Sequence, residues 1–223
     1  MNSTNANIKH VCFDLDGTLI ESRITIYKTT VKALREVGVN DPVPEKEFNS
    51  MIGMHFIDMF KNMNIELKEF EEFIGIYKNY YFDFIDDSVL YPGVVDALSF
   101  INNGRDIKVS LLTTKGQDQA EKIIKHFKLD NYFNFIMGRR DGIAHKPSAE
   151  PLLFICNQIG IDAKDTVIVG DTELDINCGK NAGAVTCGVT YGYRTKESLK
   201  ENSPDFLIDN LRELQTVLKN SSY

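Results

Sequence analysis

The 223-residue sequence lacks the features that mark membrane, secreted and nucleic-acid-binding proteins. No apolar run is long enough to span a bilayer, and Met1–Asn5 is polar where a signal peptide carries charged and apolar regions. Basic residues form no stripe, and a formal charge of -7 disfavours binding to a phosphate backbone. We therefore expect a cytoplasmic protein that binds neither a membrane nor nucleic acid.

The sequence also lacks Cys-x-x-Cys spacing, internal repeats and low-complexity linkers. Its four cysteines lie in apolar or helix-like surroundings: Cys12, Cys156, Cys178 and Cys187. This placement favours reduced thiols in the core over a disulfide framework or a zinc site. Hydrophobic residues make up 43% of the chain, which is enough for one large domain or for a domain with an insertion.

Apolar runs alternate with helical patterns over most of the chain. The first run, residues 8–13, is almost continuously apolar, as expected for a strand buried on both faces of a parallel sheet. Further strands are expected at residues 107–114, 133–137, 166–169, 184–189 and 206–208, and helices at 94–101, 117–128, 152–159 and 211–218. This alternation predicts an α/β fold with a doubly wound parallel sheet and right-handed crossovers.

Residues 21–88 break the alternation because their apolar side chains recur every three or four residues. We expect this segment to form a small helical insert without strands, and residues 1–20 and 89–223 to form the sheet domain. The segment contains a stripe of aromatic side chains: Phe70, Phe73, Tyr77, Tyr81 and Phe84. The simplest interpretation of this stripe is the insert's own core, not a cofactor site.

The first strand ends in two carboxylates, Asp14 and Asp16, followed by Gly17. In an extended segment these two side chains point the same way. Mg2+ would hold such a pair together and admit a phosphate, and paired carboxylates can also divide nucleophilic and acid–base roles. The competing interpretation is an ordinary turn that ends a buried strand.

Later strand ends carry further polar residues. Thr113 ends the second strand, Asp171 follows the fourth with Asp175 four residues on, and Lys146 lies in a loop between them. Parallel strands end at one edge of a sheet, so these residues could converge there. Taken singly, Lys146 is more typical of a solvated loop, Thr113 of a strand end and Asp175 of a helix N-cap.

Four segments in order resemble the motifs of the haloacid dehalogenase-like superfamily of phosphohydrolases. They are Asp14-x-Asp16-Gly17-Thr18, Thr113, Lys146-Pro147 and Gly170-Asp171-x-x-x-Asp175. The match in order and spacing covers nearly the whole chain, including an insert where many members carry a helical cap.

The resemblance implies a role for each motif residue. Asp14 would be the nucleophile that becomes an aspartyl phosphate, and Asp16 would protonate the leaving alcohol and then activate water. Thr113 would hydrogen-bond a phosphoryl oxygen, and Lys146 would neutralise charge. Mg2+ would be held by Asp14, Asp171, the backbone carbonyl of Asp16 and, directly or through water, Asp175.

Details within the superfamily favour a phosphatase. Dehalogenases lack the second carboxylate, which is Asp16 here, and the related sugar phosphate mutases carry histidine and arginine where this chain has Ile26 and Phe56. Gly53 and Thr113-Thr114-Lys115 make the chain most similar to the phosphoglycolate phosphatase and β-phosphoglucomutase-like subgroup. The expected substrate is therefore a small phosphate ester.

Substrate contacts are expected from Thr114 and, in the insert, from Gly53 and His55. His55 could equally be an exposed helix-cap residue. For Arg139, Arg140 and His145, which lie near Lys146, ordinary surface exposure is the stronger expectation.

Two competing functions stay open. One is a mutase that passes the phosphoryl group to a sugar hydroxyl, and the other is a phosphate-accepting signalling domain without turnover. The protein is expected to be a monomer or a weak homodimer.

Overall fold

The structure is a computed structural model that describes residues 7–103 and 106–220. The chain divides into two compact units. The first, the sheet unit, comprises the chain up to Leu19 and from Leu90 onward, and the second, the helical unit, comprises Ile20–Val89. The role of the helical unit as a cap stays a prediction.

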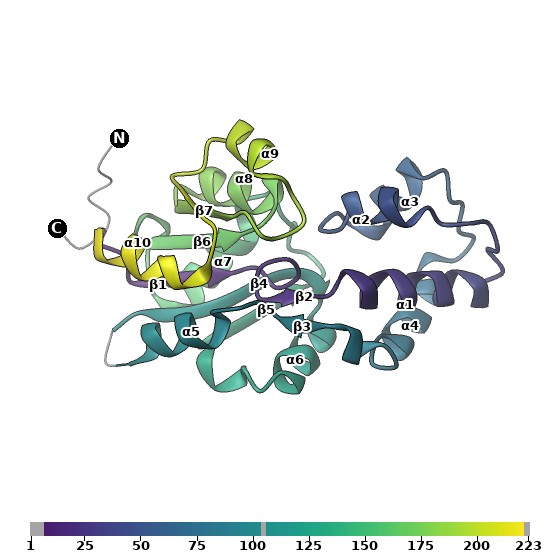
Figure 1. The fold of residues 1–223 in the computed structure, drawn as a ribbon, viewed down its shortest axis with the longest axis horizontal. Helices are drawn as coiled ribbons and strands as arrows, with labels where there is room; N and C mark the ends of the chain where they lie inside the picture. The colour runs from purple at the N-terminus through teal and green to yellow at the C-terminus, as the bar shows by residue number, and fades with distance from the viewer. Residues whose placement is uncertain (1–6, 104–105, 221–223) are drawn as a thin grey trace. The chain divides into compact units, whose positions relative to one another are not determined.

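The sheet unit is built on six parallel strands in the order β5-β4-β1-β6-β7-β8 (Figure 1). The strands are β1 His10–Phe13, β4 Lys108–Gly116, β5 Phe135–Arg139, β6 Thr166–Gly170, β7 Val185–Val189 and β8 Phe206–Ile208. From β1 the chain builds outward through β4 and β5, then returns to β6 on the other side of β1 and continues outward to β8. The predicted α/β fold with a doubly wound parallel sheet is confirmed.

Strands β1 and β6 end at nearly the same level. Phe13, the last residue of β1, pairs with Val169 of β6, which ends one residue later, and with Leu111 of β4, which continues to Gly116. The residues that follow these strands therefore lie along a single edge of the sheet, beside the point where the strand order reverses, which is where open α/β sheets bind ligands.

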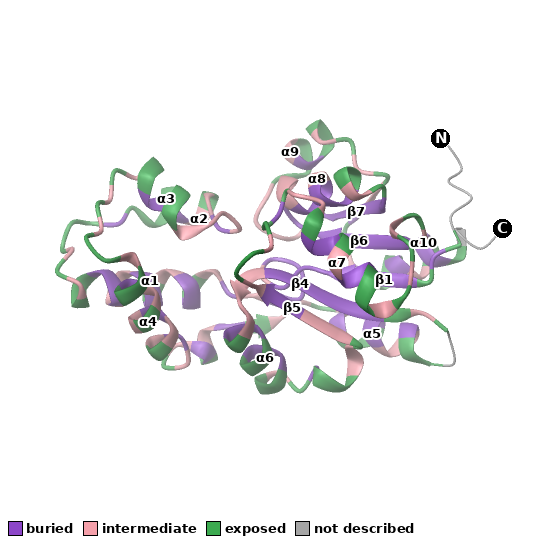
Figure 2. Ribbon diagram, turned by 180° about the vertical axis from the view of Figure 1, so that it is seen from behind, coloured by how far each residue is buried: buried purple, intermediate pink, exposed green. Residues whose placement is uncertain are grey.

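Helices cover the sheet, and every residue of β1, β6 and β7 is buried (Figure 2). The helices of this unit are α5 Val94–Asn102, α6 Gln117–His126, α7 Glu150–Ile159, α8 Glu173–Ala182, α9 Lys196–Glu201 and α10 Leu214–Asn220, with short 3-10 turns at Asp130–Tyr132, Ala163–Asp165 and Leu211–Glu213. Helix α7 packs on α8, and α5 packs on α10. Residues from α7, α8 and the strands share one core cluster: Cys12, Leu112, Met137, Leu152, Ile155, Cys156, Ile168, Cys178 and Ala184. The four cysteines are all buried and unbridged.

The helical unit contains α1 Arg23–Glu36, α2 Glu45–Ser50, α3 Phe56–Asn62, α4 Phe70–Tyr81 and the 3-10 turn Ile85–Asp87. Helix α1 packs on α4. Phe73, Tyr77 and Tyr81 of the aromatic stripe are buried, and Phe56 meets the Phe73 and Tyr77 rings edge to face at 5.3 and 4.9 Å. The stripe is therefore the core of this unit, as its spacing predicts.

The expectation of an insert without strands is wrong at one residue. Glu21 belongs to a two-residue strand, β2 Ile20–Glu21, which pairs with β3 Val89–Leu90 just beyond the other end of the insert. Two residues are too few to show the alternation from which strands are predicted. Among the described residues, no helix combines the length and the apolarity needed to cross a bilayer.

His10 at the start of β1 is fully buried between the two neighbouring strands. Its ring nitrogens lie 2.7 Å from Ser110 Oγ on β4 and 3.1 Å from Thr166 Oγ1 on β6. Burial lowers the pKa of His10 from 6.5 to about 4. The folded protein therefore holds this imidazole neutral at pH values where the unfolded chain protonates it.

This shift predicts an acid-sensitive contribution to stability. Because the folded pKa lies below the unfolded one, the contribution is complete above about pH 6.5 and is lost as pH falls through about 4. The loss amounts to roughly 3 kcal/mol. We expect His10→Gln to unfold with a shallower pH dependence between pH 6.5 and 4, measured by urea titration. The matched control, His126→Gln at an exposed site, should follow the wild type. Parallel curves for His10→Gln and wild type would contradict the assignment.

Candidate active site

Three carboxylates meet at the edge of the sheet where β1 and β6 end. Asp14 directly follows β1, Asp171 directly follows β6, and Asp175 lies in the first turn of α8. One oxygen atom of each lies within 4.8 Å of the others, and all three residues are buried. The structure thus brings together three of the four residues predicted to hold a metal. The fourth, Asp16, is predicted to contribute its backbone carbonyl and not its side chain, and that contribution stays a prediction.

Lys146 reaches this group from the loop between β5 and α7. Its Nζ donates to Asp14 Oδ1 at 2.7 Å, to Asp175 Oδ1 at 2.5 Å and to the carbonyl oxygen of Leu112 at 3.2 Å. Its side chain is 4% exposed. The alternative of a solvated loop lysine is therefore wrong, because all three ammonium protons have protein acceptors.

One lysine does not balance three buried carboxylates. Burial raises the pKa of Asp14 to about 7, a rise that Lys146 opposes and Asp175 reinforces. Burial, followed by the charges of Asp14 and Asp175, also raises the pKa of Asp171 well above its usual value. Burial works against the charge on Lys146, but Asp14 and Asp175 outweigh it and raise the lysine's pKa. A divalent cation with a preference for oxygen ligands fits the remaining negative charge.

Asp175 also stabilises the start of α8. Its Oδ2 accepts hydrogen bonds from the backbone N–H of Thr172 at 3.1 Å and from the Thr172 hydroxyl at 2.7 Å, within a capping box. Thr172 is the N-cap residue, and Asp175 occupies the third helical position. Both oxygens of Asp175 therefore have protein donors, whereas Oδ2 of Asp14 accepts no hydrogen bond from the described residues.

Thr113 lies in an irregular part of β4. Leu112 pairs with Met137 and Gly116 with Arg139, so four steps along β4 lie opposite two along β5. Such bulges redirect side chains and often lie beside active sites. The hydroxyl of Thr113, which is 3% exposed, accepts a hydrogen bond from the Lys115 N–H at 3.3 Å. Its own proton is thus available to donate.

The same bulge places Lys115 beside Asp16. Lys115 Nζ lies 3.1 Å from Asp16 Oδ2, and the two side chains are 9% and 12% exposed. The carboxylate of Asp16 is thus held by a lysine and not by the three-carboxylate group. Lys115 is absent from the predicted site residues, and its position two residues after Thr113 is the signal that could have found it.

A loop after β7 contacts Asp171 and was also missed. The Tyr193 N–H donates to Asp171 Oδ2 at 2.6 Å, and the Thr18 hydroxyl lies 3.5 Å from Asp171 Oδ1. Glycines allow this approach: a Cβ atom on Gly17 would lie 2.2 Å from Asp171 Oδ2, and one on Gly192 would lie 2.3 Å from Asp171 Cβ. The only sequence signal was a glycine between two tyrosines, which is common in ordinary loops.

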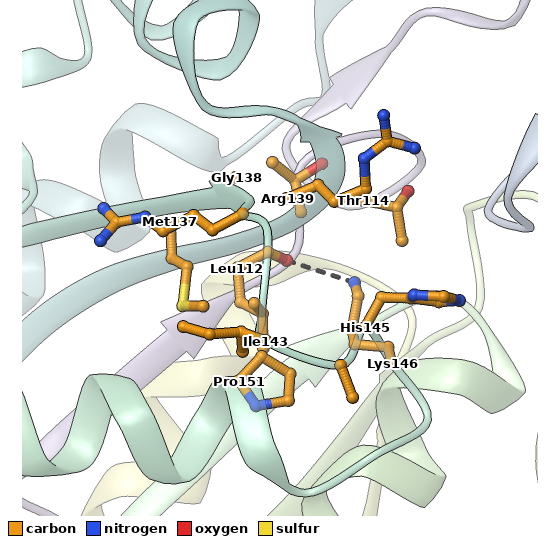
Figure 3. Close-up of a pocket in the computed structure, with 12 residues that line it drawn as sticks. Leu112, Thr114, Met137, Gly138, Arg139, Ile143, His145, Lys146 and Pro151 are labelled. Atoms are coloured by element: carbon orange, nitrogen blue, oxygen red, sulfur yellow. Dashed lines mark hydrogen bonds between the residues drawn. The ribbon is translucent and has the colours of Figure 1, made fainter. Parts of the chain in front are cut away.

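Figure 3 shows a hollow between the ends of β4 and β5, with Thr114 and Arg139 above and His145 and Lys146 below. Its free volume of about 10 Å3 has room for about one water molecule. Arg140 also lines this hollow, but its side chain is engaged in other contacts, because its Nε donates to Gln117 Oε1 at 3.2 Å. Its guanidinium also lies over the Phe135 and Phe154 rings. Thr114, Arg139 and His145 also line this hollow.

The remaining predicted residues, Gly53 and His55, belong to the helical unit. Gly53 has a φ of +104°, and His55 is the N-cap residue of α3, with its Nδ1 accepting a hydrogen bond from the Ile57 N–H at 3.3 Å. The helix-cap alternative for His55 is thus observed. Substrate binding by Gly53 and His55 stays a prediction.

Comparisons with known proteins agree with this geometry. The model of a family described as haloacid dehalogenase-like hydrolase matches residues 11–189. A Clostridium perfringens protein that provisionally carries the name pyrophosphatase PpaX is 33% identical over 212 residues, covering 95% of this chain and 98% of that protein. Phosphoglycolate phosphatase 1 of Pseudomonas aeruginosa is 30% identical over 213 residues, covering 92% of this chain and 77% of that protein. The structure of a haloacid dehalogenase-like family hydrolase from Streptococcus pneumoniae shares the fold, with a TM-score of 0.82, 24% identity and coverage of 97% and 99% of the two chains.

Proposed function

The chain belongs to the haloacid dehalogenase-like hydrolase family, and we propose that it is a Mg2+-dependent phosphatase that acts on a small phosphate ester through an aspartyl-phosphate intermediate. The observation that carries the proposal is the group formed by Asp14, Asp171, Asp175 and Lys146. The family resemblance and the hydrolase class predicted from the four motifs are confirmed.

Asp14 is the proposed nucleophile. Lys146 holds one of its oxygens, which leaves Oδ2 to attack phosphorus. The bond from Oδ2 to phosphorus forms as the bond from phosphorus to the ester oxygen breaks, so that one difficult displacement becomes two easier ones. Lys146 and the Thr113 hydroxyl would stabilise negative charge on the phosphoryl oxygens.

Asp16 is the proposed acid and base. It would give a proton to the departing ester oxygen and then take one from the water that attacks phosphorus, so that the bond from phosphorus to Asp14 Oδ2 breaks and inorganic phosphate leaves. Asp14, Asp171, Asp175 and the Asp16 carbonyl would hold Mg2+, which when bound supplies positive charge against the phosphoryl oxygens. Thr114, Gly53 and His55 are proposed to contact the rest of the substrate.

We expect Mg2+-dependent phosphate release from a panel containing phosphoglycolate, pyrophosphate, sugar phosphates, nucleotides and p-nitrophenyl phosphate. A chelator should abolish release, because the buried carboxylates need a cation to bind a phosphate dianion. The substrate ranking separates the activities named in the two curated relatives.

Conversion of a sugar phosphate without free phosphate would instead indicate a mutase. A long-lived phosphoprotein without turnover would indicate a signalling domain. The expected cytoplasmic location and the monomeric or weakly dimeric state stay predictions.

A further inference from the structure

We propose that the loop of residues 190–195 is a positioning element for the metal centre, and that the ion pair between Arg194 and Glu173 is what holds it against Asp171. This inference rests on the proposed function only in taking Asp171 as a metal ligand. Arg194 and Glu173 are positioning residues, because they would act on the metal through Asp171.

The loop fixes one oxygen of Asp171. The Tyr193 N–H donates to Oδ2 at 2.6 Å, and Gly192 packs directly on the Asp171 Cβ. The other oxygen, Oδ1, meets only the Thr18 hydroxyl among the described residues, at 3.5 Å. The hydrogen bond from the Tyr193 N–H therefore fixes the rotation of the Asp171 carboxylate. Oδ1 is then held in one orientation, in which it can bind a cation.

Each end of the loop is fastened to a different segment. At one end, the Tyr191 hydroxyl donates to the carbonyl oxygen of Thr18 at 2.8 Å. At the other end, Arg194 donates to Glu173 through Nε at 2.8 Å and Nη2 at 3.2 Å. Glu173 is the first residue of α8, two positions after Asp171, so Arg194 ties the loop to the backbone that carries the ligand.

The geometry of the Arg194–Glu173 contact suits it to hold the loop of residues 190–195 in place. A two-point guanidinium–carboxylate pair fixes orientation as well as distance, which a lysine cannot do. The Arg194 side chain is 12% exposed, and its Nη1 is buried without a hydrogen-bond partner among the described residues. All hydrogen bonds that the guanidinium makes to those residues therefore go to Glu173.

The chain offers a matched control. Two residues beyond Arg194, Lys196 pairs with Asp209 at 3.2 Å, but these side chains are 44% and 66% exposed. Removal of Lys196 deletes a cation from the same part of the chain without releasing Tyr193 from Asp171. A general effect of charge or surface chemistry would affect both sites alike.

The experiment is Mg2+ titration by calorimetry on the full chain, with wild type, Arg194→Ala, Arg194→Lys, Glu173→Gln, the Arg194→Ala/Glu173→Gln double variant and Lys196→Ala. We expect Arg194→Ala and Glu173→Gln each to weaken Mg2+ binding by about 10-fold to 100-fold. The double variant should lose no more than either single variant, because the two residues act as one contact. Arg194→Lys should restore only part of the affinity, and Lys196→Ala should bind like wild type.

With substrate, the half-saturating Mg2+ concentration should rise in Arg194→Ala while kcat at saturating Mg2+ stays within about 3-fold of wild type. Unchanged Mg2+ affinity in folded Glu173→Gln would overturn the proposal, and so would an equal loss in Lys196→Ala. Glu173→Gln keeps the shape of the side chain, so this variant provides the test if Arg194→Ala does not fold. Because calorimetry needs no turnover, Mg2+ binding with the expected variant pattern but without phosphate release would refute the phosphatase and leave this inference standing.

Discussion

Replacement of Asp14 by asparagine is expected to lower Mg2+-dependent phosphate release by about 10^3-fold or more. A carboxamide is a poor nucleophile and cannot form the aspartyl phosphate. The substitution also removes the negative charge of a proposed Mg2+ ligand and leaves Lys146, which lies 2.7 Å from Asp14 Oδ1, without that partner. Mg2+ affinity should therefore fall as well. The measurement is steady-state phosphate release with the best ester of the panel, together with detection of acid-stable phosphoprotein in quenched reactions.

Two further substitutions make this result specific. Asp162→Asn, at a side chain that is 75% exposed, is the matched control and should retain full activity. Asp16→Asn should lose most with alkyl esters and least with p-nitrophenyl phosphate, whose leaving group needs little protonation. Asp14→Asn should be equally inactive with both. Residual activity of Asp14→Asn within about 10-fold of wild type would exclude Asp14 as the nucleophile.

Replacement of Lys146 by methionine is expected to lower both the stability and the activity of the protein. It leaves Asp14 and Asp175 buried without their shared cation, a change that typically costs about 3–5 kcal/mol. Lys146 opposes the rise that burial imposes on the pKa of Asp14, so without the lysine this pKa would lie further above that of the unfolded chain. The folded variant then takes up protons at higher pH than the unfolded chain, so its free energy of unfolding should increase as pH falls from 8 toward 5.5.

Urea denaturation of Lys146→Met at several pH values, with and without Mg2+, tests this expectation. Added Mg2+ should recover part of the lost stability, because it supplies positive charge to the same carboxylates. Lys164→Met removes an exposed lysine that is paired with Asp162 and should unfold like wild type at every pH. A destabilisation of Lys146→Met that is independent of pH and Mg2+ would show that packing, not charge, is lost.

The edge of the sheet that carries the site could be predicted from the sequence. The six apolar runs and the helical patterns between them are local, and a parallel sheet places the ends of its strands together. Asp14 and Asp171 each follow such a run directly. Their convergence therefore required no knowledge of side-chain packing.

Lys146 shows where local reasoning fails. A lysine before a proline in a polar loop is most often solvated, and only its match to a family motif marked it as part of a site. In the structure its Nζ contacts Asp14, Asp175 and the Leu112 carbonyl, which come from three different elements. Its burial follows from those partners and not from its own neighbours in the sequence.

The contacts that orient the carboxylates could not be predicted, although the position of Lys115 two residues after Thr113 marks that residue for attention. Lys115 meets Asp16 because β4 bulges after Leu112, and the Tyr193 N–H meets Asp171 because of the path of the loop after β7. A bulge and a loop path leave no periodic signal in the sequence.

Burial of apolar runs and parallel pairing follow from local patterns, so the sheet, the helical character of residues 21–88 and the acidic residues at the ends of the central strands could be predicted. The groups that hold those acids could be identified only from the folded chain. Thr18 and Tyr193 contact Asp171 from two distant segments of the chain, and Arg194 binds Glu173 two residues beyond it. Contacts of that kind form when loops pack together, and the free energy that selects them is spread over the whole fold.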